Sequence, residues 1–384
     1  MMINWMGGWP REGLISSSEW EERLAAAAER FLIAGTSDLS SRLPKQDQLQ
    51  EIMAEGLLNG ITRRFGGGLR LARGADAALG RLAQHSLSAG DVVLVESLTS
   101  RSALQVFRKA GARIEAVFGD RQGMDPDALK RAISRHKPRL VYAAPACSDP
   151  DGKAWSRQRT EEAVEMCRAS HVLMLRDDRQ EMLIYDDELY GRLYVARSGD
   201  RQKSLQGEKG VLSIGQLPPG LVAGLRFGWV AGHADELEQW LPDSQAADTP
   251  TASELLPLEC LALVDLLLEQ PLADQIDMLR VRNRARMLRI TELLGAQSSS
   301  GLNWRPPDGG GHLWLTLPEG LDGEALLRAA WLRGLIFQPG APFYATESQP
   351  HTLRLTFADS DERQLKLGTQ RLFETIGDFM GRSR

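Results

Sequence analysis

The hydrophobic pattern between about residues 69 and 230 alternates between two kinds of segment. Short and almost continuous apolar runs, such as 91–97 and 139–145, are typical of strands that are buried on both faces. Between them lie segments such as 126–134, in which apolar residues recur at helical spacing. Strands that alternate with helices in this way predict a mostly parallel sheet with helices on both faces.

The pattern changes after about residue 240. In the first part, strands are predicted at 69–72, 91–97, 112–118, 139–145, 171–177, 210–216 and 225–232, and helices at 76–84, 103–110, 126–134 and 160–170. In the second part, helical sequence runs over 254–294 with a break near Pro271, helices are predicted at 323–333 and 362–380, and strands at 312–318, 334–340 and 352–358. The sequence therefore predicts a large α/β unit followed by a smaller α+β unit.

The change of pattern also gives the expected domain boundaries. Residues 1–40 are expected to form an N-terminal segment that joins the small domain, and residues 41–250 a large, cofactor-type α/β domain. Residues 251–384 are expected to form an interdomain helix and a small C-terminal domain. A length of 384 residues suits two domains of this kind.

Composition and charge narrow the classes of partner. The net charge is −5 and there is no basic block, so we expect no nucleic-acid partner. The most apolar stretch, 255–272, is broken by Glu259, Asp265, Glu269 and Pro271, and is too short and too charged to span a membrane. The first residues do not resemble a secretion signal, and the three cysteines have no metal-binding spacing. A cytoplasmic protein without a metal or a membrane partner is expected.

Several motifs then occur in the order and spacing of one family. They lie at 90–117, at 139–152 with the turn Asp149-Pro150-Asp151-Gly152, at 167–178, at 217–230, and at 311–358. Over about residues 3–378 the chain resembles the fold-type I pyridoxal-phosphate-dependent aminotransferases of class I/II, and is most similar to the aminotransferase-like half of MocR-type regulators. The resemblance implies an aspartate aminotransferase-like fold, pyridoxal 5'-phosphate as cofactor and a homodimer. We expect the chain to begin where the second half of a MocR regulator begins, without its DNA-binding half.

The lysine on which this family depends is missing. An enzyme of this kind needs a lysine to form the Schiff base with its cofactor. Aligned on the segment 224–229, the family's lysine falls on Pro219, and a register shifted by three residues puts it on Gln216. Lys153 is the only nearby candidate, because no lysine occurs between Lys209 and Lys366. Cofactor binding is therefore doubtful and not expected to be covalent.

The resemblance assigns vestigial roles to four other residues, and none is expected to be catalytic. Gly74 belongs to the phosphate-binding turn, Arg226 matches the phosphate-pairing arginine, and Asp177 matches the aspartate that holds the pyridine nitrogen. Asp187 is an alternative candidate for the aspartate at the pyridine nitrogen, because Asp187 and Tyr190 resemble the family's Asp-x-x-Tyr motif. Arg354 matches the arginine that grips a substrate carboxylate, a task that suits a planar guanidinium.

Five further positions around the implied cofactor depart from the family pattern. Asp76 places a carboxylate where the phosphate should lie, although an acid is stabilising at a helix N-terminus. The other departures are Ala75 in the phosphate turn, Ser100 at the stacking aromatic, Asp149 at the ring-hydroxyl asparagine and Gln180 at the ring-hydroxyl tyrosine.

Three functional hypotheses remain. The first is a pseudoenzyme: a homodimer that binds a small carboxylate or serves as a scaffold or regulator. The second is an active aminotransferase that acts on amino acids and 2-oxo acids with an atypical site, although none of the six histidines replaces the lysine. The third is a regulatory subunit that works in trans.

Overall fold

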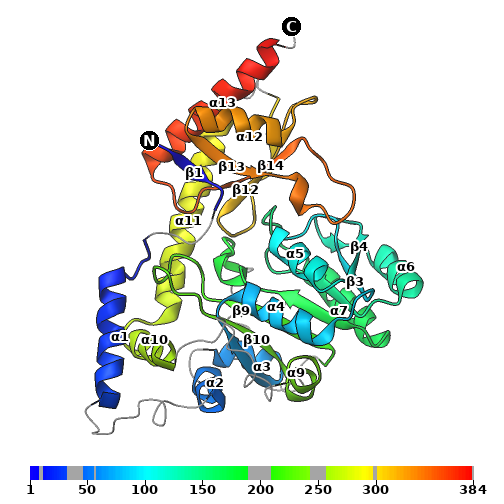
Figure 1. The fold of residues 1–384 in the computed structure, drawn as a ribbon, viewed down its shortest axis with the longest axis vertical. Coiled ribbons are helices and arrows are strands. Elements are labelled where there is room, and N and C mark those ends of the chain that lie inside the picture. The colour runs from blue at the N-terminus through cyan, green and yellow to red at the C-terminus, as the bar shows by residue number, and fades with distance from the viewer. Residues whose placement is uncertain are drawn as a thin grey trace.

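The computed structural model describes residues 1–7, 12–32, 46–55, 58–188, 209–242, 257–296 and 301–382. Its framework consists of a seven-stranded sheet and a five-stranded sheet (Figure 1). In Figure 1 the larger sheet and its helices form the lower part, and the smaller sheet lies in the upper part beside α12 (Gly323–Leu332) and α13 (Glu362–Arg382). The long helix α11 (Leu272–Gly295) runs between the two parts.

The larger sheet has the strand order β2-β10-β9-β8-β7-β3-β4. Its strands are β2 (Gly67–Ala72), β3 (Val92–Glu96), β4 (Arg113–Val117), β7 (Leu140–Ala143), β8 (Leu173–Asp177), β9 (Val211–Gln216) and β10 (Gly228–His233). Only β10 runs antiparallel to its neighbours, because β9 reaches it through a loop that contains no crossover helix. The mostly parallel sheet expected from the sequence is confirmed.

Helices cover both faces of this sheet, as the apolar runs predict. They are α2 (Gln46–Glu55), α3 (Asn59–Arg64), α4 (Ala75–Ser86), α5 (Arg101–Lys109), α6 (Pro126–His136), α7 (Arg157–Ala169), the short η1 (Glu181–Leu183) and α9 (Ala234–Trp240). Strand β3 illustrates the two-sided burial: Val93 and Val95 pack in one core with α4 and α5, whereas Val92 and Leu94 pack in the other with α6. A small hairpin of β5 (Gly119–Asp120) and β6 (Gly123–Met124) lies outside the sheet.

The smaller sheet has the strand order β1-β13-β14-β12-β11. Its strands are β1 (Ile3–Trp5), β11 (Asn303–Trp304), β12 (His312–Thr316), β13 (Leu335–Pro339) and β14 (Thr352–Thr356), and the 3-10 turn η3 (Ala341–Phe343) follows β13. Leu353 and Leu355 of β14 point into the small core, so by alternation Arg354 and Thr356 face the other way. That second face turns a row of polar side chains away from the small core.

The N-terminal segment contacts both parts of the molecule. Strand β1 pairs with β13 and so joins the smaller sheet. Helix α1 (Ser17–Leu32), however, packs against α10 (Pro257–Glu269). Its buried Trp20 and Ala27 belong to the core of the larger sheet. The apolar side of α1 therefore finds its partners at the large unit, and residues 33–40 lie outside the described part. The domain boundaries themselves stay a prediction.

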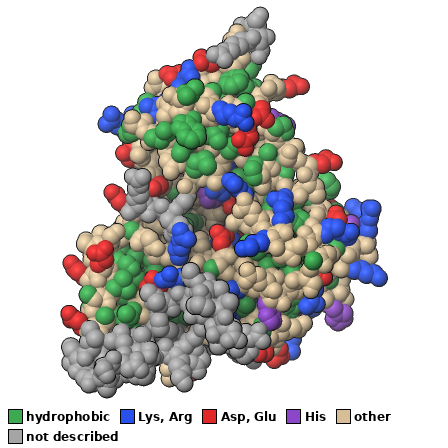
Figure 2. Space-filling view, viewed as in Figure 1, with side chains coloured by type: hydrophobic (Ala, Val, Ile, Leu, Met, Phe, Trp, Pro, Cys, Tyr) green, Lys and Arg blue, Asp and Glu red, His purple; other side chains and the backbone are tan. Residues whose placement is uncertain are grey.

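The surface agrees with the charge pattern of the sequence. In Figure 2 the Lys and Arg side chains are scattered among acidic ones, without a continuous basic block on this face. None of the helices in the described part of the chain is both long and apolar enough to cross a membrane. The described residues also contain no cluster of metal-binding side chains. The three cysteines are buried and free.

Candidate cofactor and ligand site

A cavity of about 610 Å³ is lined by residues of both parts of the molecule. The larger part contributes loops that follow the carboxyl ends of β3, β7, β8 and β9, where ligands bind in open α/β sheets. The smaller part contributes the polar face of its sheet. The lining includes Asp76, Ser100, Asp149, Arg179, Gln180, Gln216, Pro219, His312, Gln338, Arg354 and Thr356.

Asp177, at the end of β8, is only 2% exposed and is fully engaged. It accepts a hydrogen bond from the Tyr142 hydroxyl, and both of its oxygens accept from Arg179 Nε, at 2.8 and 2.9 Å. A further Arg179 nitrogen, Nη2, lies 2.7 Å from Asp177 Oδ2. The arginine in the turn after β8 therefore pairs with the aspartate that the resemblance assigns to a pyridine nitrogen.

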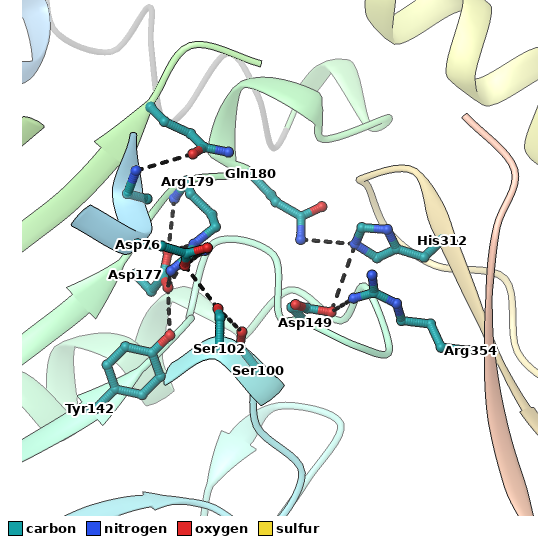
Figure 3. Close-up of polar contacts among 12 residues, drawn as sticks. Asp76, Ser100, Ser102, Tyr142, Asp149, Asp177, Arg179, Gln180, His312 and Arg354 are labelled. Atoms are coloured by element: carbon teal, nitrogen blue, oxygen red, sulfur yellow. Dashed lines mark hydrogen bonds and ion pairs between the residues drawn. The ribbon is translucent and has the colours of Figure 1, made fainter. Parts of the chain in front are cut away.

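The same arginine reaches the start of α4 (Figure 3). Arg179 Nη1 donates to Asp76 Oδ1 at 2.6 Å, and Ser102 Oγ donates to the same oxygen at 2.8 Å. Ser102 Oγ lies 3.0 Å from the Oγ of Ser100, the residue at the position of the family's stacking aromatic. One guanidinium thus joins the strand-end carboxylate to a carboxylate at a helix N-terminus.

In the turn that resembles the family's phosphate-binding turn, a backbone N–H is already hydrogen-bonded to a side chain of this chain. Gly74 precedes α4 with φ 85°, and the Ala75 backbone N–H donates to Gln216 Oε1 at 3.2 Å. The Cβ of Arg226 lies near Gly74, but Arg226 is an exposed residue and does not line the cavity. Pro219 and Gln216, the two possible positions of the lysine, both line the cavity.

A second group of paired side chains lies on the opposite side of the cavity. Arg354 Nη1 donates to Asp149, so the arginine expected to grip a carboxylate already holds one of the chain's own (Figure 3). His312 Nε2 lies 3.0 Å from the Gln180 side-chain nitrogen and 3.9 Å from Asp149 Oδ1. The structure thus brings Asp149, Gln180 and Arg354 together with a histidine.

Two alternative candidates lie away from the cavity lining. Lys153 Nζ is 3.0 Å from Glu96 and donates to the Asp120 carbonyl. Burial alone would lower the pKa of Lys153, but Glu96, Asp151 and Asp120 together outweigh it and the pKa is raised, which keeps the amine charged. Asp187, the rival of Asp177, has a largely exposed side chain paired with Arg280.

The pKa shifts agree with these pairings. Burial alone would raise the pKa of Asp76 and Asp149. Arg179 with Ser102 beside the first, and Arg354 with its neighbours beside the second, together outweigh burial, so both pKa values are lowered. Burial and the nearby Asp177 raise the pKa of Tyr142 well above its usual value. Burial and the nearby Arg354 lower the pKa of His312 to about 4, so this imidazole is neutral at pH 7.

The family model for aminotransferases of class I and II matches residues 22–372, and the chain belongs to this family. The resemblance found in the sequence is confirmed. Pyridoxal 5'-phosphate is the cofactor of the family.

Known relatives include both enzymes and regulators. A 2-aminoadipate transaminase of Thermus thermophilus is 27% identical over 305 residues, which cover 79% of this chain and 73% of the relative. An uncharacterized HTH-type transcriptional regulator of Bacillus subtilis, YisV, is 23% identical over 348 residues, covering 90% of this chain and 69% of the regulator. The crystal structure of LysN, an alpha-aminoadipate aminotransferase of Thermus thermophilus complexed with N-(5'-phosphopyridoxyl)-L-leucine, superposes with a TM-score of 0.80 at 24% identity. The match covers 99% of this chain and 93% of that structure.

The residues of the cavity do not fit the family's cofactor. Asp177, the carboxylate that the family uses to bind the pyridine nitrogen, is paired with Arg179. The helix N-terminus that the family uses to bind the phosphate carries Asp76, and its Ala75 N–H already donates to Gln216. No lysine lines the cavity among the described residues. Bringing in the cofactor would require these pairs to break and would place a phosphate beside a carboxylate.

Sequence reasoning missed Arg179, Tyr142 and the role of Gln216. The available signal for Arg179 was its place two residues after the strand-end Asp177, from which its side chain can turn back onto the carboxylate. Tyr142 lies inside a buried apolar strand, where a hydroxyl needs a partner. Nothing in the pattern of the chain indicates that Gln216 reaches Ala75.

Proposed function

We propose that this chain is a class I/II aminotransferase homologue that does not form a Schiff base and instead binds a small molecule in the cavity between its two sheets. The observation that carries the proposal is the position of Arg179, which bridges Asp177 and Asp76 across the place that the family gives to the cofactor. A pseudoenzyme of this kind keeps the fold and replaces the chemistry of the site.

The charge arrangement supports this function. A buried carboxylate that has lost its cationic partner is costly, and Arg179 supplies that partner permanently to Asp177. The Asp76 carboxylate completes the pair at the helix N-terminus, where negative charge is favourable. The chain thus supplies both a cation at the aspartate and an anion at the helix without any added group.

A second candidate function is an active aminotransferase with an atypical site. The names of the relatives favour it over the pseudoenzyme, because they include transaminases that match about four fifths of this chain. This candidate requires an amine other than the family's lysine, and the pairing of Lys153 with Glu96 counts against the nearest one. A regulatory role in trans is supported by the likeness to transcriptional regulators such as YisV.

We also propose a cytoplasmic homodimer. Apolar side chains on one side of α11 are exposed, with Met278 at 56%, Val281 at 70% and Leu288 at 57%, and their spacing places them on a single face. An exposed apolar face of a helix is typical of a surface that is covered by a partner. A monomer in sedimentation at micromolar concentration would contradict this part of the proposal.

The absence of a Schiff base is tested by mixing the purified chain with pyridoxal 5'-phosphate, treating it with borohydride and mapping the peptides by mass. The proposal expects no reducible visible band and no single labelled lysine. Stoichiometric labelling of a single lysine, with one label per chain, would overturn the proposal and favour the active enzyme.

A further inference from the structure

Buried polar atoms without a hydrogen-bond partner cluster around the cavity. Ten buried side-chain atoms in the described ranges have no hydrogen-bond partner. Six of them belong to residues that line this cavity, and one of these six, Arg179 Nη2, forms an ion pair with Asp177. Within those ranges, the other five atoms form no ion pair. These atoms are Asn283 Oδ1, His312 Nδ1, Gln338 Oε1, Arg354 Nε and Thr356 Oγ1. Buried polar groups are normally hydrogen-bonded, so such a cluster indicates a place where a ligand supplies the partners.

Strand register places four of these side chains next to one another. Gln338 is directly opposite Arg354, and His312 is directly opposite Thr356, which puts each pair about 5 Å apart. Arg354 and Thr356 are two residues apart on the same face of β14, about 7 Å along the strand. These four residues, called the polar wall below, therefore form one compact patch of the smaller sheet.

Asn283 adds a fifth group from a different element. It lies on α11 and is only 3% exposed, and its Oδ1 has no hydrogen-bond partner within the described part of the chain. An unpaired buried amide costs free energy unless a bound molecule satisfies it. Because Asn283 and the polar wall line the same cavity, a single small molecule can contact both.

The backbone at Gly7 lies directly against the polar wall. A Cβ added to Gly7 would lie 2.8 Å from Thr356 Oγ1 and 3.3 Å from Arg354 Nη2, which is too close for a side chain. Gly7 also has φ 87°, which disfavours any other residue. The N-terminal segment therefore borders the wall here with backbone alone.

The charges of the cavity argue against a charged ligand group at this wall. The cavity is lined by three carboxylates and three guanidinium groups: Asp76, Asp149, Asp359, Arg101, Arg179 and Arg354. The charge of Arg354 is already compensated by Asp149, and a carboxylate entering beside it would meet that anion. The small-carboxylate ligand expected from Arg354 stays a prediction, and this pairing counts against it.

The unpaired atoms define the chemistry of the missing partner. Arg354 Nε–H donates, and so does His312 Nδ1–H when its Nε2 accepts from Gln180. Asn283 Oδ1 and Gln338 Oε1 accept, and a hydroxyl such as that of Thr356 does either. A carboxylate has no donor for the two amide oxygens, and an ammonium has no acceptor for the two N–H groups. A primary carboxamide has both, with two N–H donors and a carbonyl acceptor.

We propose that the polar wall and Asn283 form a binding subsite for an uncharged primary carboxamide group of a small molecule. This proposal rests on the proposed function, because it names the kind of ligand that the cavity binds. It assigns the specificity of the site to the residues opposite Arg179 and leaves the Arg179 pairs intact while the ligand is bound.

The test uses two molecules of equal shape that differ in charge, glutaramide and glutarate. Binding to the full chain is measured by calorimetry and ligand-observed NMR at pH 7. We expect glutaramide to bind at least ten times more tightly than glutarate. Equal or tighter binding of glutarate would overturn the proposal, and so would binding of neither compound.

Two variants locate the binding. Asn283→Leu and Thr356→Val remove hydrogen-bonding groups with little change of volume, and each should weaken glutaramide binding at least tenfold. The matched control is Thr316→Val, on the same face of the sheet but outside the cavity lining, and it should bind like the parent. Unchanged binding in both cavity variants would overturn the assignment. A labelled lysine in the borohydride experiment would instead overturn the proposed function, whatever glutaramide does.

Discussion

The two sides of the cavity treat their polar groups in opposite ways. On the side of the larger sheet, Asp177, Arg179 and Asp76 satisfy one another at distances between 2.6 and 2.9 Å. On the side of the smaller sheet, Gln338, Thr356 and Asn283 keep buried atoms without partners. Buried polar groups that pair with other groups of the same chain stabilise the fold, whereas buried polar groups left without partners favour ligand binding at a cost to stability. This difference is what the proposed function expects, with the side of the larger sheet serving a structural role and the opposite side binding the ligand.

The largest effect is expected from Arg179→Met, which would leave Asp177 buried without its cation. Removing one partner of a buried pair costs roughly 3–5 kcal/mol of unfolding free energy, measured by urea denaturation. Arg157→Met, which removes an exposed pair with Glu161, serves as the control and should cost less than about 1 kcal/mol. Adding Asp177→Asn to Arg179→Met should recover part of the loss. An Arg179→Met protein as stable as the parent would remove the contrast between the two sides.

A smaller effect is expected from the pH dependence that His312 contributes. Its folded pKa of about 4 lies below the ordinary value of 6.5, so between these values the unfolded chain binds a proton that the folded chain does not. Stability therefore falls as pH is lowered through this window, by at most about 3 kcal/mol. Urea denaturation at pH 7 and pH 4.5 should show a smaller difference for His312→Gln than for the parent.

The control for this experiment is His85→Gln, because His85 is exposed on α4. It should leave the pH profile unchanged. A profile that is equally steep in His312→Gln would show that the neutral imidazole does not contribute to the wall as described. Asp76 and Asp149 have lowered pKa values, so their contribution is lost only at pH values below this window. Burial raises the pKa of Glu96, but Glu96 is present in the parent and in both variants, so its contribution cancels when their profiles are compared.

The smallest effect, and the one of opposite sign, is expected from Asn283→Leu in the absence of a ligand. Replacing an unpaired buried amide by an apolar group of similar size should raise the unfolding free energy, by about 1 kcal/mol. Thermal denaturation of the parent and the variant provides the measurement. A loss of more than about 1 kcal/mol would mean that Asn283 has a partner in the empty protein and that the wall is not open there.

The fold followed from the sequence because its signals are periodic. The apolar runs at β3 and β7 identify strands buried on both faces, and the break near Pro271 separates α10 from α11. The sequence did not predict strand β1, because three residues are too few to show a periodic pattern of apolar and polar positions. The apolar face of helix α1 does not reveal in the sequence which core it joins, and in the structure Trp20 and Ala27 pack in the core of the larger sheet.

The site followed only in part, for a different reason. The positions of Asp177, Asp149 and Arg354 come from the family resemblance. The structure places Asp149 and Arg354 in the cavity lining, and Asp177 behind it, paired with the lining residue Arg179. That Arg179 turns back to Asp177, and that Asp149 turns to Arg354, depends on the turn after β8 and on how the two sheets face each other. Such contacts between distant residues leave no periodic trace in the chain.

The most direct measurement is equilibrium dialysis of pyridoxal 5'-phosphate against the parent and against the double variant Arg179→Met, Asp76→Ser, both shown to be folded by circular dichroism. If Arg179 and Asp76 hold the place of the cofactor, the parent should retain no cofactor, while the variant, with its cation and its competing carboxylate removed, should retain a measurable amount. A parent that retains one molecule of cofactor per chain would contradict the central claim, because Arg179 and the cofactor cannot both hold Asp177.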